Sequence, residues 1–173
     1  MVVAPYLDTL LLLLVAAAAI NDLSSRRIPN RLLLGGLVGA LVLHALSPDP
    51  GPALLSSVGG ALTGFLVFIP FYLLHGMAAG DVKMMATVGA FTGPAVALEI
   101  AVLAWCAGGL MALAILIYSG RLWLALRNLW GIVWPALLRI PALPPAARES
   151  AGSMPYGLAI AAGTVYLLIG RYA

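Results

Sequence analysis

The sequence predicts an all-α membrane protein with about six transmembrane helices and a segment on the cytoplasmic membrane face before the last helix. Hydrophobic residues make up 63% of the 173 residues, and charged residues only 9%. The mean hydropathy is +1.07. Soluble domains carry about 25% charged residues, so this composition leaves too little polar surface for a fold in water. The hydrophobic residues are also gathered into long runs, which is typical of membrane helices.

Six apolar runs mark the expected helices, given below in chain order. A helix needs roughly 17–25 residues to cross the hydrocarbon layer, or fewer where the bilayer thins. The first, third, fifth and sixth runs are predicted to cross it, whereas the second and fourth cross only as tilted or partly polar helices. The runs are Pro5–Ile20, Leu32–Leu46, Ala53–Leu74, Val82–Ala90, Ala95–Tyr118 and Met154–Ile169.

The first run has to be distinguished from a cleaved signal peptide. No basic residue precedes it, and Asp8 stands where a signal peptide has its positive charge. A polar loop and further apolar runs follow it, rather than a soluble mature domain. We therefore expect this run to remain as a membrane-spanning helix.

The connections between the runs differ in length and composition. The segments 47–52 and 92–94 are rich in Pro and Gly, which favours tight turns between antiparallel helices. The stretch of about 119–153 is much longer and contains Trp and Arg, which suits a helix in the lipid headgroup layer. We interpret it as a passive surface connection, with a role in gating substrate as the alternative. The whole chain, residues 1–173, is expected to form a single polytopic domain.

The basic residues orient the predicted helices. With the N-terminus outside, nearly every Lys and Arg falls on an inner segment, and only Arg171 is left outside. Cytoplasmic loops of membrane proteins carry this excess of positive charge, so the net charge of +3 reflects topology rather than nucleic-acid binding. Asp22 and Asp81 then both lie at the cytoplasmic face, at similar depth. The inner basic residues are Arg26, Arg27, Arg31, Lys83, Arg121, Arg127, Arg139 and Arg148.

Two aspartates at helix ends are the candidates for chemistry. The chain has only six acidic residues, and ionisable residues in membrane segments are costly and usually functional. Asp22 and Asp81 would lie close together, and two neighbouring carboxylates share one proton and titrate as a pair. The ionised member takes a proton from water while the protonated member polarises a peptide carbonyl. The pair is therefore predicted to hydrolyse peptide bonds.

Simpler interpretations of both aspartates remain open. Asp81 is placed to cap the fourth helix, because aspartate accepts hydrogen bonds from free backbone N–H groups. Asp22 is equally compatible with a solvated loop residue that pairs with Arg26 or Arg27. We predict no metal site and no cofactor, because His44 and His75 lack nearby acidic or thiol partners.

Three ordered motifs resemble those of the prepilin peptidases, intramembrane aspartic proteases of the GxGD type. Asp22 is followed by Ile28-Pro29-Asn30, which is similar to the family's first-aspartate loop. Gly80-Asp81-Val82-Lys83 matches the second-aspartate region, and Pro155-Tyr156-Gly157 matches the segment that opens the last helix. The chain is most similar to the short form that serves Flp-type pilus assembly.

The resemblance implies a function and a location. It implies an endopeptidase of the bacterial inner membrane that removes the basic leader of prepilins or pseudopilins after a glycine, at the cytoplasmic face. The implied partners are these precursors, the lipid bilayer and the pilus assembly machinery, without nucleic acid. The cysteine-bearing insertion of the long family members is missing here, which implies peptidase activity without methyltransferase activity. Ala78 replaces the first glycine of the GxGD motif, a change that bears on rate or substrate fit.

The remaining motif residues have both a functional and a structural interpretation. Lys83 steadies local charge or substrate, or it anchors its helix at the membrane surface. Pro29 and Asn30 shape a turn, and Gly80 leaves room for an extended substrate. Pro155, Tyr156 and Gly157 either offer backbone to the substrate or simply start a helix.

Two other function classes remain open from sequence alone. One is a non-catalytic assembly factor that binds pilin precursors, with Ala78 as a sign of lost activity. The other is a proton-coupled transporter subunit, because intramembrane carboxylates also mark ion paths. The lack of a recognisable inverted repeat argues against the transporter.

Overall fold

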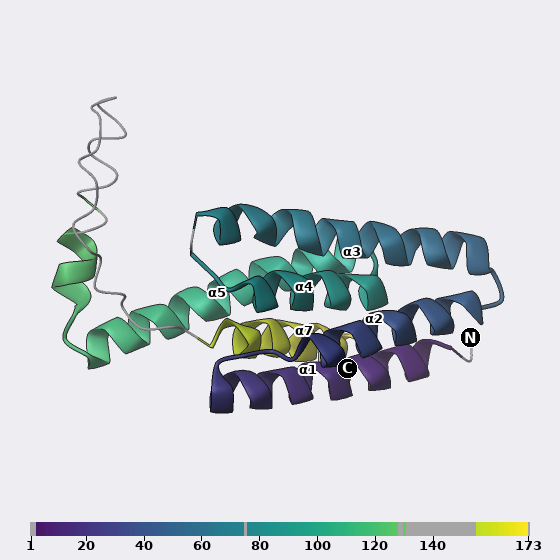
Figure 1. Ribbon diagram of the computed structural model, residues 1–173, viewed down its shortest axis with the longest axis horizontal. Helices are drawn as coiled ribbons and strands as arrows, with labels where there is room; N and C mark the ends of the chain where they lie inside the picture. The colour runs from purple at the N-terminus through teal and green to yellow at the C-terminus, as the bar shows by residue number, and fades with distance from the viewer. Residues whose placement is uncertain (1–2, 75, 128–129, 131–154, 173) are drawn as a thin grey trace, which may run out of the picture. The chain divides into compact units, whose positions relative to one another are not determined.

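A computed structural model describes residues 3–74, 76–127, 130 and 155–172 of the chain. These residues form helices and short connections, and no strand occurs among them (Figure 1). The all-α prediction is confirmed, and each apolar run corresponds to one helix. The helices are α1 (Ala4–Ser25), α2 (Asn30–Ala45), α3 (Pro50–Leu73), α4 (Ala79–Thr92), α5 (Pro94–Tyr118) and α7 (Tyr156–Tyr172).

The helices differ in their capacity to cross a membrane. Helices α1, α3 and α5 are long and apolar enough to cross by length and composition, and α2 is a shorter apolar helix. Helix α7 begins after Pro155 and has 17 residues, the lower limit of the range for a crossing helix. Helix α4, with 14 residues, is about 21 Å long. The chain is a multi-helix membrane protein, and the crossing of all six helices stays a prediction.

The chain divides into two compact units. The first contains Met1–Gly108 and Pro155–Ala173, and the second contains Gly109–Met154. The second unit includes the end of α5 and a helical stretch at residues 122–127. Most of the expected surface segment at about 119–153 lies outside the described residues.

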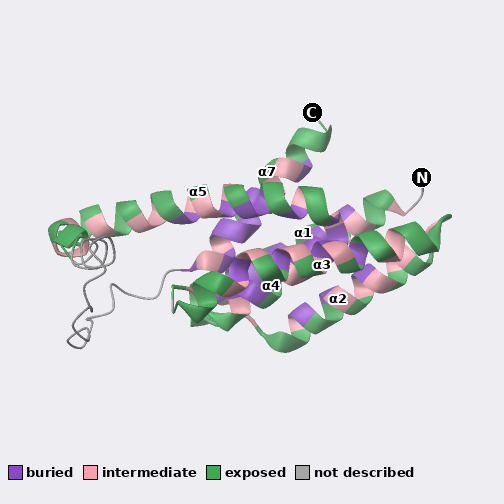
Figure 2. Ribbon diagram, turned by 90° about the horizontal axis from the view of Figure 1, so that it is seen from above, coloured by how far each residue is buried: buried purple, intermediate pink, exposed green. Residues whose placement is uncertain are grey.

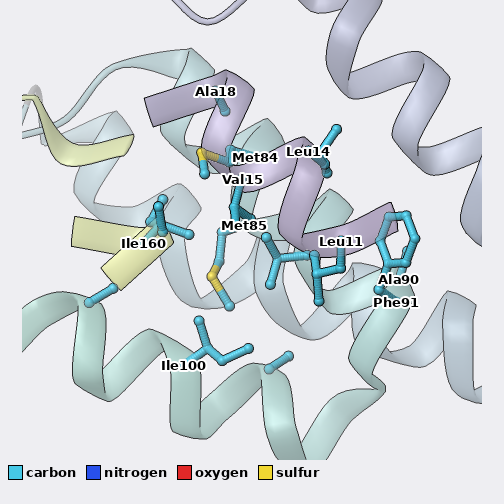
Figure 3. Close-up of a cluster of buried hydrophobic side chains, with 14 of the residues drawn as sticks. Leu11, Leu14, Val15, Ala18, Met84, Met85, Ala90, Phe91, Ile100 and Ile160 are labelled. Carbon is cyan, nitrogen blue, oxygen red and sulfur yellow. The ribbon is translucent and has the colours of Figure 1, made fainter. Parts of the chain in front are cut away.

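Helix α4 occupies the centre of the first unit. It contacts α1, α2, α3 and α7, and nine of its fourteen residues are buried. Met84 and Met85 are fully buried and pack with side chains from α1, α5 and α7 (Figure 3). Because α4 also carries Asp81 near its first turn, the core fixes the position of that carboxylate.

Glycines allow α3 and α4 to approach each other closely. A Cβ atom on Gly60 would collide with the backbone of Gly89, and one on Gly64 would collide with the carbonyl of Met85. Small residues four apart permit such contacts between membrane helices, where lipid is as apolar as the side chains and tight packing drives association. The pair therefore forms a rigid support for the start of α4.

A proline explains one polar contact within the bundle. Pro94 has no N–H, so the carbonyl of Ala90 lacks the partner that a continuous helix would supply. Ser57 Oγ donates to this carbonyl at 2.8 Å, and His44 Nε2 lies 3.1 Å from it. The buried backbone oxygen is thus satisfied from α3 and α2.

The outer faces of the helices are apolar. Figure 2 shows buried residues gathered in the middle of the packed helices and exposed residues on their outer faces. The exposed side chains include Leu55, Leu66 and Val102, which are 76%, 60% and 52% exposed. Such surfaces are unfavourable in water and suit a lipid environment.

Candidate active site

Asp22 lies in the last turns of α1, and its side chain is buried at 6% exposure. The backbone N–H of Gly157 donates a hydrogen bond to Asp22 Oδ2 at 2.8 Å. Helix α7 begins at Tyr156, so this N–H is one of the free donors at a helix N-terminus, which favours a negative partner. The interpretation of Asp22 as a solvated loop residue is wrong, because α1 continues through it to Ser25, but the interaction with Arg26 that went with that interpretation is present.

Asp81 lies in the first turn of α4 and is 4% exposed. Its Oδ2 accepts a hydrogen bond from the backbone N–H of Ala78 at 3.1 Å. The capping interpretation is therefore correct for one of its two oxygens. Within the described part of the chain, the other oxygen has no hydrogen-bond partner. A capping role and a chemical role are compatible at this residue.

The two carboxylates are close enough to interact electrostatically. They come from α1 and α4, which contact each other. The sequence prediction that Asp22 and Asp81 meet at one end of the bundle thus agrees with their geometry. Two buried carboxylates with this interaction cannot both ionise easily.

Ile28, which the sequence marked only as part of the motif after Asp22, lies between the two motif regions. A Cβ atom placed on Gly80 would be 3.5 Å from Ile28 Cβ, and one on Gly157 would be 3.1 Å from Ile28 Cδ1. Ile28 therefore contacts the residue before Asp81 and the residue that binds Asp22. An apolar side chain between Arg27 and Pro29, in an otherwise polar segment, was the available signal.

Tyr156 is held beside this pair by an aromatic cluster. Its ring meets Phe68 edge-on, with centroids 6.1 Å apart, and Phe68 stacks on Trp105 at the same separation. Tyr156 also packs against Gly108, where an added Cβ would be 2.6 Å from its ring. An electrostatic interaction links Tyr156 to Asp81. Phe68 and Trp105 were not predicted, because nothing distinguishes them from other apolar residues within their runs.

The remaining predicted residues form the edge of the site. Lys83 Nζ donates to Asn30 Oδ1 at 3.1 Å, which ties α4 to the start of α2. Pro29 is the N-cap of α2 in an extended conformation. Pro155 is buried, and its carbonyl accepts a hydrogen bond from the N–H of Leu158 at 3.2 Å.

Neither Ala78 nor Gly80 needs glycine for its backbone conformation. Ala78 has φ −81° and ψ 153°, a region open to any residue. Among the described glycines, positive φ occurs at Gly93 and Gly120 rather than at Gly80. The alanine in place of the motif glycine therefore causes no backbone strain.

The described residues contain no group of three His, Cys, Asp or Glu side chains placed to hold a metal ion. His44 faces the carbonyl of Ala90 instead, and His75 lies outside the described residues. The chemistry available at this end of the bundle is therefore that of two carboxylates, one tyrosine and free backbone N–H groups.

A sequence profile of the type IV leader peptidase family matches residues 9–113, well over half of the chain. The chain belongs to this family. No curated protein and no solved structure matches it. This leader peptidase is thus a membrane protease of the kind that processes prepilins. The matched residues include Asp22, Asp81, Lys83, Pro29 and Asn30, whereas Pro155–Gly157 lies beyond them.

Proposed function

We propose that this leader peptidase is an aspartic endopeptidase in which Asp22 and Asp81 form the catalytic pair. The observations that carry the proposal are the burial of both carboxylates on contacting helices, α1 and α4, and the position of Ile28 beside Gly80 and Gly157 in their motif regions. Both belong to the segment that matches the family profile. Burial raises the cost of separate charges, which favours one shared proton and suits acid–base chemistry.

The proposed mechanism uses one water molecule and no cofactor. The ionised carboxylate takes a proton from water, and the oxygen of that water bonds to the scissile carbonyl carbon. The protonated carboxyl group gives its proton to the carbonyl oxygen. The tetrahedral intermediate then collapses: one of its hydroxyl groups returns a proton to the ionised carboxylate as the C–N bond breaks, and the departing amine receives a proton from the other carboxyl group. The pair returns to its singly protonated state.

The substrate is proposed to be a prepilin or pseudopilin cut after a glycine, at the junction of a basic leader and an apolar segment. The excess of Lys and Arg on the predicted inner segments favours the cytoplasmic face of the inner membrane. Tyr156, Gly157 and Gly80 are placed to shape this site, while Lys83, Asn30, Pro29 and Pro155 fix the elements around it. The single-domain organisation of residues 1–173 stays part of this proposal.

The test is co-expression with candidate prepilins, scoring leader removal on a gel for wild type, Asp22→Asn and Asp81→Asn. Loss of an acid or base typically lowers the rate about 10²–10⁴-fold, so both variants should lose at least about a hundredfold. Asp49→Asn is the matched control, because Asp49 is exposed and precedes α3 rather than α1 or α4. Size-exclusion profiles identify variants that fail to fold.

The result that contradicts the catalytic pair is normal cleavage by both aspartate variants. Binding of prepilins by well-folded wild type, without cleavage of any of them, would instead indicate an assembly factor. A prepilin with tryptophan in place of the glycine before the cut completes the experiment. Its normal processing would contradict the proposed cleavage position.

A further inference from the structure

A groove lies on the first unit between α2, α3 and α4, apart from the two carboxylates. Its volume is about 420 Å³. These three helices lie side by side in both views (Figures 1 and 2). The inner wall is apolar, and Leu34 and Phe65 are 63% and 40% exposed at its mouth. The lining residues are Asn30, Arg31, Leu33, Leu34, Leu37, Ala61, Phe65, Lys83, Ala86 and Thr87.

The charge of the groove is entirely positive. Arg31 and Lys83 are its charged lining residues, and no acidic side chain lines it. Lys83 uses one of its three N–H donors on Asn30 Oδ1. Both cations are exposed, and no ion pair involves them within the part of the chain that the structure describes. Two cations beside an apolar wall complement a ligand with an anionic head and a hydrocarbon tail.

The size of the groove decides between two kinds of apolar occupant. A helix about 10–12 Å wide takes roughly 800–1,200 Å³ for two turns, so the apolar helix of a substrate would lie across the mouth of the groove rather than within it. A methylene group is similar in size to a water molecule, whose share of liquid volume is about 30 Å³. The groove therefore has room for on the order of fourteen such groups, the length of one acyl chain.

We propose that this groove binds one anionic phospholipid, with an acyl chain between α2 and α3 and the phosphate against Arg31 and Lys83. Basic pockets between transmembrane helices recognise anionic headgroups in this way. Lys83 lies two residues after Asp81 on the same helix and holds Asn30 at the start of α2. The bound headgroup would therefore brace the edge of the candidate active site.

The test measures lipid binding by the purified full-length protein without any substrate. Native mass spectrometry counts bound lipid during titration with phosphatidylglycerol or with phosphatidylcholine carrying the same acyl chains. A basic residue near anionic lipid contributes about 1 kcal/mol, which corresponds to about a fivefold change in affinity. Phosphatidylglycerol should bind more tightly, and Arg31→Gln and Lys83→Gln should each weaken that binding about fivefold.

Two further variants separate the groove from general surface charge. Arg27→Gln removes an equivalent exposed charge from a residue outside the groove and should leave the affinity unchanged. Leu34→Trp fills the groove from an exposed position and should reduce binding of phosphatidylglycerol at least fivefold.

Three outcomes would overturn the proposal. One is equal binding of the two lipids, and another is an equal loss in Arg27→Gln and Arg31→Gln. The third is a Leu34→Trp variant that keeps its lipid affinity but loses prepilin cleavage, which would assign the groove to substrate. Since binding is measured without cleavage, failure here is distinct from failure of the proposed peptidase mechanism.

Discussion

Helix α1 carries a buried aspartate near each end, and the two have opposite surroundings. Asp8 and Asp22 are fourteen residues apart, about four helical turns, so both face α7. Asp8 accepts hydrogen bonds from Arg171 Nη1 at 3.3 Å and from the Tyr172 hydroxyl at 2.6 Å. Asp22 instead accepts one from the backbone N–H of Gly157 and interacts with Asp81, a second carboxylate.

The comparison shows that burial alone does not mark a chemical group. The charge of Asp8 is balanced by a guanidinium, which makes the pair a fixed structural contact. Asp22 also has a cation nearby, Arg26, but its neighbour across the contact with α4 is a second carboxylate, and two like charges favour a shared proton. The residue that a buried carboxylate faces, rather than its exposed fraction, distinguishes a structural contact between helices from a candidate catalytic group.

The largest expected effect is a contrast between the two ends of α1, where a substitution at Asp22 lowers cleavage and a substitution at Asp8 lowers thermal stability. Asp22→Asn should lower cleavage at least about a hundredfold, with an unchanged Tm, because the asparagine oxygen can still accept the hydrogen bond from the N–H of Gly157. Asp8→Asn should keep cleavage within about threefold and lower the Tm by roughly 3–10 °C, which corresponds to about 1–3 kcal/mol. Arg171 is 47% exposed, so the loss is smaller than for a fully buried pair.

Cleavage assays and thermal unfolding in detergent check this contrast. If Asp8→Asn lost cleavage as completely as Asp22→Asn at an unchanged Tm, the separation of the two ends into structure and chemistry would be incorrect.

An intermediate effect is expected at Gly157, whose N–H binds Asp22. A methyl group there would be 2.8 Å from Asp22 Oδ2 and 3.1 Å from Ile28 Cδ1, so the carboxylate must move. A displacement of about 1 Å in an active site lowers the reaction rate on the order of a hundredfold. The shift in Gly157→Ala should be smaller, so we expect kcat to fall about tenfold.

Gly170→Ala is the matched control for this measurement, because it lies in the same helix with no atom within 4 Å of the added Cβ. Equal kcat values for the two variants would show that the Asp22 carboxylate tolerates displacement.

The smallest effect is expected for Ala78→Gly, which restores the first glycine of the GxGD motif. The backbone of Ala78 already has an unstrained extended conformation, and its N–H is still available to Asp81. Cleavage should change by less than about twofold in steady-state assays. A tenfold gain would instead show that the alanine methyl group obstructs the substrate.

The sequence predicted the helices and placed Asp22 and Asp81 near helix ends, and the structure extends the first helix beyond its apolar run. The run stops at Ile20, whereas α1 continues to Ser25. Asn21 Nδ2 donates to the carbonyl of Ala17 at 2.8 Å, and Ser25 Oγ donates to that of Asn21 at 2.8 Å, so these polar side chains find partners within the helix. Hydropathy marks where apolar residues stop, which is not where a helix has to end.

Other parts of the site depend on contacts between distant segments. The packing of Phe68 on Trp105 and the position of Ile28 beside Gly157 involve residues that look ordinary in a linear pattern. Asp8 was noticed only as evidence against a signal peptide, because its partner Arg171 lies 163 residues further along the chain. Pairings of this kind follow from tertiary structure and leave no local signal.

The hydrogen bond between Gly157 and Asp22 spans 135 residues and joins the first described helix to the last. Ribosomes make α7 after the other five described helices, so a partly synthesised chain has Asp22 and Asp81 in the membrane without the donor that orients Asp22. In the proposed mechanism, cleavage therefore has to wait until α7 inserts beside α1. The order of synthesis would then itself keep an unfinished protease inactive.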